Sequence, residues 1–201
     1  MKVALIDYGA GNVTSVSRAL RRLGVESETT QSPDTIAAAN CLILPGVGHC
    51  AALINAVDKY SQRQAIVDAI ARSVPFLGIC LGLQAFYVAS EEAPTLDGLG
   101  ILSGRVSLLP ETVKLPHMGW NKVRRTRESR LLRDISPDAY FYFAHSYAAP
   151  PAGEETVAAC EHGREFTAVV ERGNLFGVQF HPEKSGAAGA QLLSNFLRAA
   201  A

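Results

Sequence analysis

The sequence predicts an α/β protein in three layers, with an open, mostly parallel sheet flanked by helices and extended by antiparallel strands. Uninterrupted apolar runs alternate with helical stretches in the first half, which is typical of parallel strands buried on both faces. The second half contains short strands, turns and few helices, which favours antiparallel pairing. With 201 residues and no low-complexity linker, the chain is expected to form a single domain, residues 1–201.

The first half begins with an apolar run at residues 3–6, an expected buried strand that ends in the turn Gly9-Ala10-Gly11. Asn12 can cap the helix that follows, and Gly24 ends its apolar stripe. We expect strands at residues 25–30 and 41–44, helices around residues 52–57 and 62–72, and a strand that ends at Cys80. A helix is then expected from Leu81 to about Ala89.

Short strands bounded by turn-forming residues are expected through the second half. Their ranges are 99–106, 122–125, 139–143, 156–160, 168–171 and 175–180. A last helix over residues 187–200 closes the chain, with Leu193, Phe196 and Leu197 on its apolar stripe.

Composition excludes several classes of function. Nineteen basic residues balance nineteen acidic ones, so the net charge gives no reason to expect a nucleic-acid or membrane partner. The basic cluster at residues 122–127 lacks interleaved aromatic residues and fits a solvated face. The N-terminus reaches a charge too early for a signal peptide, and no apolar run is long enough to span a bilayer. We therefore expect a cytoplasmic protein.

Neither the cysteines nor the glycines indicate a bound cofactor. The four cysteines form no Cys-x-x-Cys pair and lack the spacing of a zinc site, so no metal is expected. A chain of this size has a sufficient core without disulfides, which favours a reducing compartment. Gly9 and Gly11 do not complete a Gly-x-Gly-x-x-Gly motif, so dinucleotide binding is weakly supported.

Cys80 stands between two glycines in the stretch Gly78-Ile79-Cys80-Leu81-Gly82, at the end of an apolar run. This spacing is that of a nucleophile elbow, a sharp turn from strand to helix whose neighbours must lack bulk. The turn would place the thiol at a helix N-terminus, which favours the thiolate. The alternative is a buried cysteine that ends a core strand.

A cysteine nucleophile also needs oxyanion donors and a base. The loop Pro45-Gly46-Val47-Gly48 ends a neighbouring strand, so the N–H groups of Val47 and Leu81 could face one oxyanion; the alternative is an ordinary glycine-rich turn. His181 follows an apolar strand, and in His181-Pro182-Glu183 the proline turn would bring the carboxylate to the imidazole. A structural histidine is the alternative.

The other histidines carry weaker signals. His162 lies in Glu161-His162-Gly163-Arg164 and is expected to be a solvated hairpin tip. His49 adjoins the glycine loop and could lie near the site without acting in it.

The segments Gly78-Ile79-Cys80-Leu81-Gly82-Leu83-Gln84 and Gly177-Val178-Gln179-Phe180-His181-Pro182-Glu183-Lys184-Ser185 together resemble the class I (triad) glutamine amidotransferases. Four further segments are similar to the glutaminase subunits of imidazole glycerol phosphate synthases: residues 7–12, 45–48, 116–121 and 142–147. The resemblance implies a flavodoxin-like core. Small departures are Leu83, where methionine is frequent, and Cys50, where an apolar residue is frequent.

The resemblance implies that Cys80 attacks the side-chain amide of glutamine, His181 moves the protons, and Glu183 orients His181. It places glutamine recognition on Val47, Gly48, Gln84, Glu92, Ser146 and Tyr147. Glu92 is assigned by its spacing from Cys80, and Glu91 remains an alternative.

A (β/α)8-barrel cyclase subunit is the partner that the resemblance implies, with ammonia passed to it directly. Residues that match family positions near the docking face are Asn12, Trp120, Asn121, Tyr142 and Lys184. Trp120 in the core and Lys184 as a solvated charge are the alternatives. In the family the glycine loop becomes competent only when the partner and its ligand are bound, so weak activity is expected for the isolated chain.

Two other hypotheses stay open at this point. One is a triad glutaminase that serves another synthase, or a γ-glutamyl hydrolase. The other is a catalytically silent regulatory subunit, against which the presence of Cys80, His181 and Glu183 argues.

Overall fold

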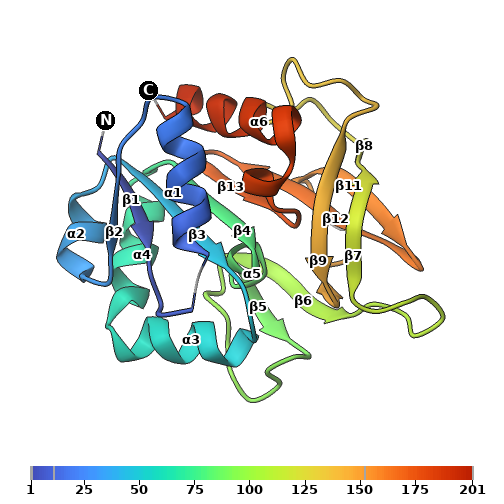
Figure 1. The fold of residues 1–201 in the computed structure, drawn as a ribbon. Helices are drawn as coiled ribbons and strands as arrows, with labels where there is room; N and C mark the ends of the chain where they lie inside the picture. The colour runs from blue at the N-terminus through green and yellow to red at the C-terminus, as the bar shows by residue number, and fades with distance from the viewer. Residues whose placement is uncertain (1, 11, 152, 201) are drawn as a thin grey trace.

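A computed structural model describes residues 2–10, 12–151 and 153–200, so Gly11 of the expected first turn lies outside the described residues. Within these ranges, the main sheet has the strand order β2-β1-β3-β4-β13-β12-β11-β8, with helices on both faces (Figure 1). Strands β1, β2, β3, β4 and β13 pair in parallel, while β12, β11 and β8 continue the sheet antiparallel. The predicted α/β class with an antiparallel extension is confirmed.

The parallel half follows the predicted order closely. Its strands are β1 (Val3–Ile6), β2 (Ser27–Thr30), β3 (Cys41–Gly46), β4 (Phe76–Cys80) and β13 (Leu175–Val178). Its helices are α1 (Val13–Arg22), α2 (Pro33–Ala38), α3 (Cys50–Lys59), α4 (Gln62–Ala71) and the C-terminal α6 (Gly186–Ala199). Helix α2 was not predicted, although Ser32 caps it through the Thr35 N–H and Pro33 occupies its first turn.

Two apolar layers cover the sheet because successive side chains on each strand point to opposite faces. Val3 and Leu5 of β1 pack in the layer that contains α1 and α6. Ala4 and Ile6 pack in the other layer, against α2, α3 and α4. Among the described residues, no helix combines the length and the apolar character needed to cross a bilayer.

The helix expected from Leu81 to about Ala89 is wrong. Helix α5 spans only Leu81–Gln84, and β5 (Tyr87–Ser90) follows and pairs with β6 (Leu102–Leu108). The N–H groups of Ile101 and Leu102 donate to the Phe86 carbonyl, and the Leu99 N–H donates to that of Ala85. These long-range bonds compete successfully with the next helical turn, and Val88 favours the extended conformation.

The strand expected at residues 122–125 is also corrected, because two short strands share this region. Strand β7 (His117–Lys122) begins earlier and pairs antiparallel with β9 (Tyr140–His145), while β8 (Arg124–Arg125) joins the main sheet beside β11 (Thr156–His162). Strand β12 (Arg164–Arg172) lies between β11 and β13. Strand β10 (Tyr147–Ala148) pairs with β6, and a 3-10 turn, η1 (Pro182–Lys184), precedes α6.

Three glycines allow β3, β4 and α5 to approach closely. A Cβ atom on Gly82 would lie 1.9 Å from the Leu44 carbonyl oxygen, and one on Gly46 would lie 2.4 Å from the Gly82 nitrogen. A Cβ atom on Gly78 would lie 2.7 Å from the Gly82 oxygen. The glycines on both sides of Cys80 are therefore required by backbone contact, as the elbow motif predicts.

We predict that Gly82→Ala lowers the free energy of unfolding by more than about 3 kcal/mol, because the new methyl group meets a backbone oxygen that cannot rotate away. Gly24→Ala is the control, since Gly24 has a φ of +76° but open space around it and should lose only about 1 kcal/mol. Urea unfolding measures both. Equal losses would contradict the steric explanation.

Candidate active site

Parallel pairing brings three chain segments together at the carboxyl end of the sheet. Cys80 ends β4, Gly46 of β3 lies opposite it in the register, and Val178 of β13 lies opposite Ile79. The glycine loop, Cys80 and His181 therefore leave the sheet at one edge. Cys80 has φ 55° and ψ −108°, a strained conformation for a residue with a side chain, and stands immediately before α5. This is the geometry predicted for a nucleophile elbow.

His181 and Glu183 form the hydrogen-bonded pair that the sequence predicts. The His181 Nδ1 lies 2.9 Å from Glu183 Oε1, and both side chains are almost completely buried. Pro182 begins the η1 turn, which brings the carboxylate back to the imidazole. The His181 backbone N–H donates to the Tyr142 carbonyl at 2.8 Å, so the position of the base is tied to β9.

Asn12 does not use its side chain as a helix cap, contrary to our expectation. It occupies the N-cap position of α1, but its side chain makes no capping hydrogen bond. Its Nδ2 instead donates to Glu183 Oε1 at 3.3 Å, across 171 residues of sequence. The same carboxylate oxygen thus accepts from His181 and from Asn12, which fixes its orientation.

The electrostatics favour an imidazolium at His181. Burial opposes the charge, but the hydrogen bonds and negative charges of Cys80 and Glu183 outweigh it and raise the pKa of His181 to about 10. A protonated His181 beside Cys80 stabilises the thiolate, so the arrangement suits nucleophilic attack by sulfur.

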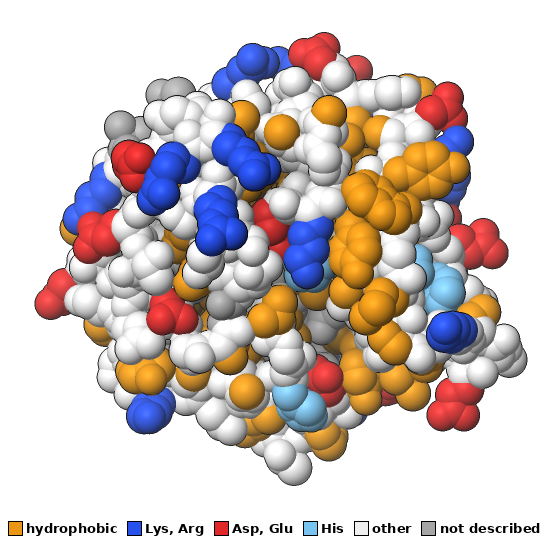
Figure 2. All heavy atoms as spheres, in the orientation of Figure 1, with side chains coloured by type: hydrophobic (Ala, Val, Ile, Leu, Met, Phe, Trp, Pro, Cys, Tyr) orange, Lys and Arg blue, Asp and Glu red, His pale blue; other side chains and the backbone are white. Residues whose placement is uncertain are grey.

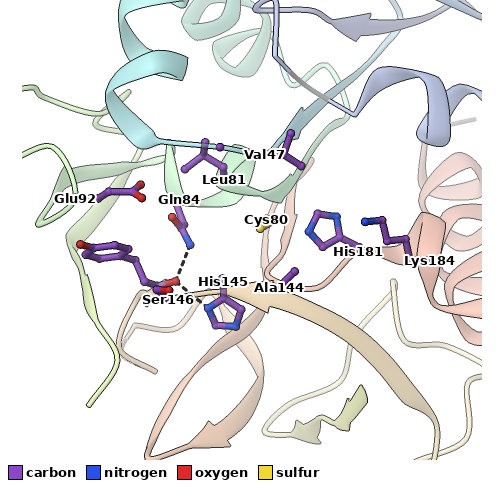
Figure 3. Close-up of a pocket in the computed structure, with 12 residues that line it drawn as sticks. Val47, Cys80, Leu81, Gln84, Glu92, Ala144, His145, Ser146, His181 and Lys184 are labelled. Carbon is purple, nitrogen blue, oxygen red and sulfur yellow. Dashed lines mark hydrogen bonds between the residues drawn. The ribbon is translucent and has the colours of Figure 1, made fainter. Parts of the chain in front are cut away.

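A cavity opens beside Cys80, and every residue predicted to act in catalysis or substrate binding lines it, except the more deeply buried Glu183 (Figure 3). Ala144, His145 and Lys184 complete the wall. The full lining is Val47, Gly48, Cys80, Leu81, Gln84, Glu92, Ala144, His145, Ser146, Tyr147, His181 and Lys184.

The structure distinguishes between the two candidate glutamates. Glu92 lines the cavity, and its Oε2 accepts from the Cys50 N–H, the first of α3, at 2.8 Å. Glu91 does not line the cavity; its Oε2 accepts from the Leu108 N–H at 2.9 Å. Of the two carboxylates, that of Glu92 is therefore the one that lines the cavity.

Val47 does not present its N–H to the cavity in this conformation. That N–H donates to the Tyr8 hydroxyl at 2.7 Å, and the hydroxyl lies 2.6 Å from the Val47 carbonyl oxygen, to which it donates. Burial raises the pKa of Tyr8 to about 12, so the phenol keeps its proton. The expectation that the Val47 and Leu81 N–H groups face one oxyanion is thus not met here, because Tyr8 binds the Val47 peptide.

Three further side chains near the site were not identified as site residues from the sequence alone. Tyr8 holds the glycine loop, His145 lines the cavity, and Gln179 lies 3.6 Å from the Cys80 sulfur. Gln179 directly follows β13 and His145 ends β9, and a buried polar residue at the end of an apolar strand is the one local signal that could have identified them.

His162 is not simply a solvated hairpin tip. Its ring stacks on His117 with centroids 4.2 Å apart, and its Nε2 lies 2.9 Å from the Lys114 carbonyl oxygen. His49 behaves as expected, because it caps α3 through its Nδ1 and the Ala51 N–H and does not line the cavity.

Trp120, Tyr142 and Lys184 form a cluster beside the cavity. The Trp120 and Tyr142 rings meet edge to face at 5.9 Å, and Lys184 Nζ lies 5.5 Å from the centre of the Tyr142 ring. Trp120 is 56% exposed, which excludes the alternative of a core tryptophan. Asn121, also on β7, donates to the Glu161 carbonyl and approaches His117.

The described residues contain no disulfide and no cluster of side chains suited to hold a metal. The four cysteines there are free thiols, and burial raises the pKa of Cys41 and of Cys160 to about 12. No group of three or more His, Cys, Asp or Glu side chains suited to hold a metal occurs among the described residues.

Comparisons with known proteins show the family of the chain. The family model "Glutamine amidotransferase class-I" matches residues 4–200. The chain is 49% identical to the imidazole glycerol phosphate synthase subunit HisH of Moorella thermoacetica, over 96% of this chain and 93% of that protein. It is 45% identical to HisH of Escherichia coli K12, over 98% of this chain and 99% of that protein.

Solved structures support the fold. A crystal structure of a glutamine amidotransferase has a TM-score of 0.78 at 19% identity, covering 100% of this chain and 99% of that one. A chain of the PurLQS structure from Thermotoga maritima has a TM-score of 0.75 at 19% identity, covering 98% and 97%. The chain therefore belongs to the class-I glutamine amidotransferases and, within them, to the HisH subunits of imidazole glycerol phosphate synthase.

Proposed function

We propose that this chain, as a single domain of residues 1–201, is the glutaminase subunit of a cytoplasmic imidazole glycerol phosphate synthase in histidine biosynthesis. The observation that carries the proposal is the meeting of Cys80 with the His181–Glu183 pair in a cavity that also contains Glu92. The near full-length similarity to HisH subunits favours this synthase over the other users of triad glutaminases.

The reaction begins when the Cys80 thiolate attacks the side-chain amide carbon of glutamine. A carbon–sulfur bond forms, the carbon–nitrogen bond breaks, and protonated His181 gives its proton to the departing ammonia. Neutral His181 then removes a proton from water, which attacks the thioester, releases glutamate and restores the thiolate. Glu183 holds the imidazole in the tautomer that both steps need.

Glutamine is bound at both of its ends. Its α-ammonium group meets the Glu92 carboxylate, while its side-chain amide lies between Cys80 and Gln84. The Gln84 amide nitrogen already donates to the Tyr147 carbonyl and to Gln179 Oε1, so its own oxygen remains to accept from the substrate amide. Ser146 and Tyr147 of the opposite wall position the substrate backbone.

An exposed apolar surface beside the cavity suits the second subunit. Met118, Trp120 and Tyr140 of β7 and β9 are 64%, 56% and 51% exposed. Figure 2 shows hydrophobic side chains gathered in a band over the region where Figure 1 places these two strands. We propose that this surface docks on a (β/α)8-barrel cyclase, with Asn12, Asn121, Tyr142 and Lys184 around it, so that ammonia passes between the subunits without protonation by bulk water.

The first prediction concerns the triad. Cys80→Ala should lower glutamine hydrolysis by at least about a thousandfold, because no other group can form the thioester. Glu183→Gln should cost less, since Glu183 only orients His181. Both are measured as glutamate formation by the complex with the cyclase and its ligand. Cys80→Ala should keep normal affinity for the cyclase, and hydrolysis that survives this change would refute the assignment of the nucleophile.

The second prediction concerns the Tyr8 hydroxyl. Tyr8→Phe removes both hydrogen bonds to Val47, so the freed N–H can turn toward the cavity, and glutaminase activity without partner should rise about tenfold. Tyr87→Phe is the control, because Tyr87 is also a buried tyrosine but lies on β5 and is not the hydroxyl that bonds Val47. An unchanged rate for Tyr8→Phe in the isolated chain would show that this bond does not hold the loop inactive.

The third prediction concerns docking. Trp120→Ala should weaken binding of the cyclase subunit at least about thirtyfold, because a large exposed aromatic side chain at the centre of an apolar surface is a typical hot spot. Val88→Ala, at an exposed apolar residue of β5, should change the Kd less than threefold. Isothermal titration calorimetry gives both values. Equal effects of the two changes would mean that the docking surface lies elsewhere.

A further inference from the structure

Gln179 is a completely buried amide next to the nucleophile. It follows Val178, the last residue of β13, and its relative exposure is 0%. Its backbone N–H already donates to the Ala168 carbonyl at 2.9 Å. A buried side-chain amide is costly unless its polar atoms are bonded, so the partners of this side chain are informative.

The Tyr147 backbone carbonyl decides, through Gln84, which way the amide oxygen and nitrogen of Gln179 point. The Tyr147 oxygen can only accept, so the Gln84 atom 2.7 Å from it must be the amide nitrogen. The same nitrogen lies 3.0 Å from Gln179, which must therefore present its oxygen to Gln84. The Gln179 amide nitrogen then points the other way, toward Cys80 Sγ at 3.6 Å.

The Tyr147 carbonyl, on which this assignment depends, is also bonded by buried His145, which is in turn bonded by buried His117. His145 Nδ1 lies 2.9 Å from the Tyr147 oxygen and must donate to it, which leaves His145 Nε2 to accept from His117 Nδ1 at 3.2 Å. Burial is the main cause that lowers the pKa of His117 to about 4 and that of His145 to about 3. Both rings are therefore neutral at physiological pH and keep these tautomers. Figure 3 shows Gln84 and His145 both bonded to the segment after β9.

We propose that Gln179 is a catalytic residue that donates a hydrogen bond to the Cys80 sulfur and stabilises its thiolate form. The inference rests on the proposed function only in taking Cys80 as the nucleophile. Its N–H would stabilise the negative sulfur before attack and again when the thiolate leaves the thioester. His181 supplies the positive charge and the mobile proton, while Gln179 supplies a donor that never titrates.

Other groups around the sulfur also affect its ionisation and must be held constant. His181 and Tyr8 interact electrostatically with Cys80, and Glu92, His145 and Lys184 line the same cavity. None of these is altered by a change at Gln179. A shift in the ionisation of Cys80 in a Gln179 variant can therefore be assigned to the lost donor.

The test is the rate at which iodoacetamide alkylates Cys80 as a function of pH, followed by mass spectrometry of the peptide that contains it. Gln179→Met keeps the size of the side chain but removes the donor. The pH of half-maximal rate should rise by about one unit, so that alkylation falls about tenfold at pH values well below this midpoint and is unchanged well above it. In the complex with the cyclase, kcat should fall by a similar factor while KM changes less than twofold.

Gln62→Met is the matched control, because Gln62 is also a completely buried glutamine but bonds the carbonyls of Asp7 and Gln31. It should lower the Tm without moving the alkylation profile. A Gln179→Met profile that superimposes on that of the unchanged chain, with only a loss of Tm, would overturn the proposal and make Gln179 a packing residue.

Gln179→Leu gives a second route if the methionine variant does not fold, since it also removes the donor and adds no charge beside the sulfur. Its profile should also move to higher pH, and an unchanged profile would equally overturn the proposal. Alkylation requires neither glutamine nor the cyclase. A chain that shows the shift but hydrolyses no glutamine in the complex would refute the proposed function and support the role of Gln179.

Discussion

The parallel pairing of β3, β4 and β13 is the constraint on which the site depends. It brings the glycine loop, Cys80 and His181 to one edge of the sheet although they are distant in sequence. Gly46, Gly78 and Gly82 then let α5 pack on β3 and β4 with backbone against backbone. The same glycines that make the elbow therefore also decide how close the neighbouring loop lies to the nucleophile.

Burial and charge oppose each other at this edge, and the balance differs between histidines. Desolvation is the largest cause that lowers the pKa of His145 and of His117, and interactions with neighbouring imidazoles lower both further. His181 is buried to a similar degree, but Cys80 and Glu183 raise its pKa instead. One small region thus contains neutral imidazoles that accept and donate in fixed directions, and another imidazole able to hold and release a proton.

Much of the site could be predicted because its signals are local. The spacing of the glycines around Cys80 and the His181-Pro182-Glu183 turn are features of a few consecutive residues. The contacts that were missed join residues far apart: Tyr8 and Val47 are separated by 39 positions, and Cys80 and Gln179 by 99. The helix expected beyond Gln84 failed for a similar reason, because β6 and its preceding loop bind the carbonyls that would have continued it.

Strand β9 has a consequence for how this sequence can vary. Its residues alternate between outward-facing Tyr140 and Tyr142 and inward-facing Phe141, Phe143 and His145. A single inserted or deleted residue would exchange the two faces, because side chains on a strand alternate with a period of two. Such a change would put tyrosines into the core and a histidine on the exposed apolar surface at once. Length changes are therefore expected to be excluded from this strand and from Ser146 and Tyr147, which follow it and line the cavity.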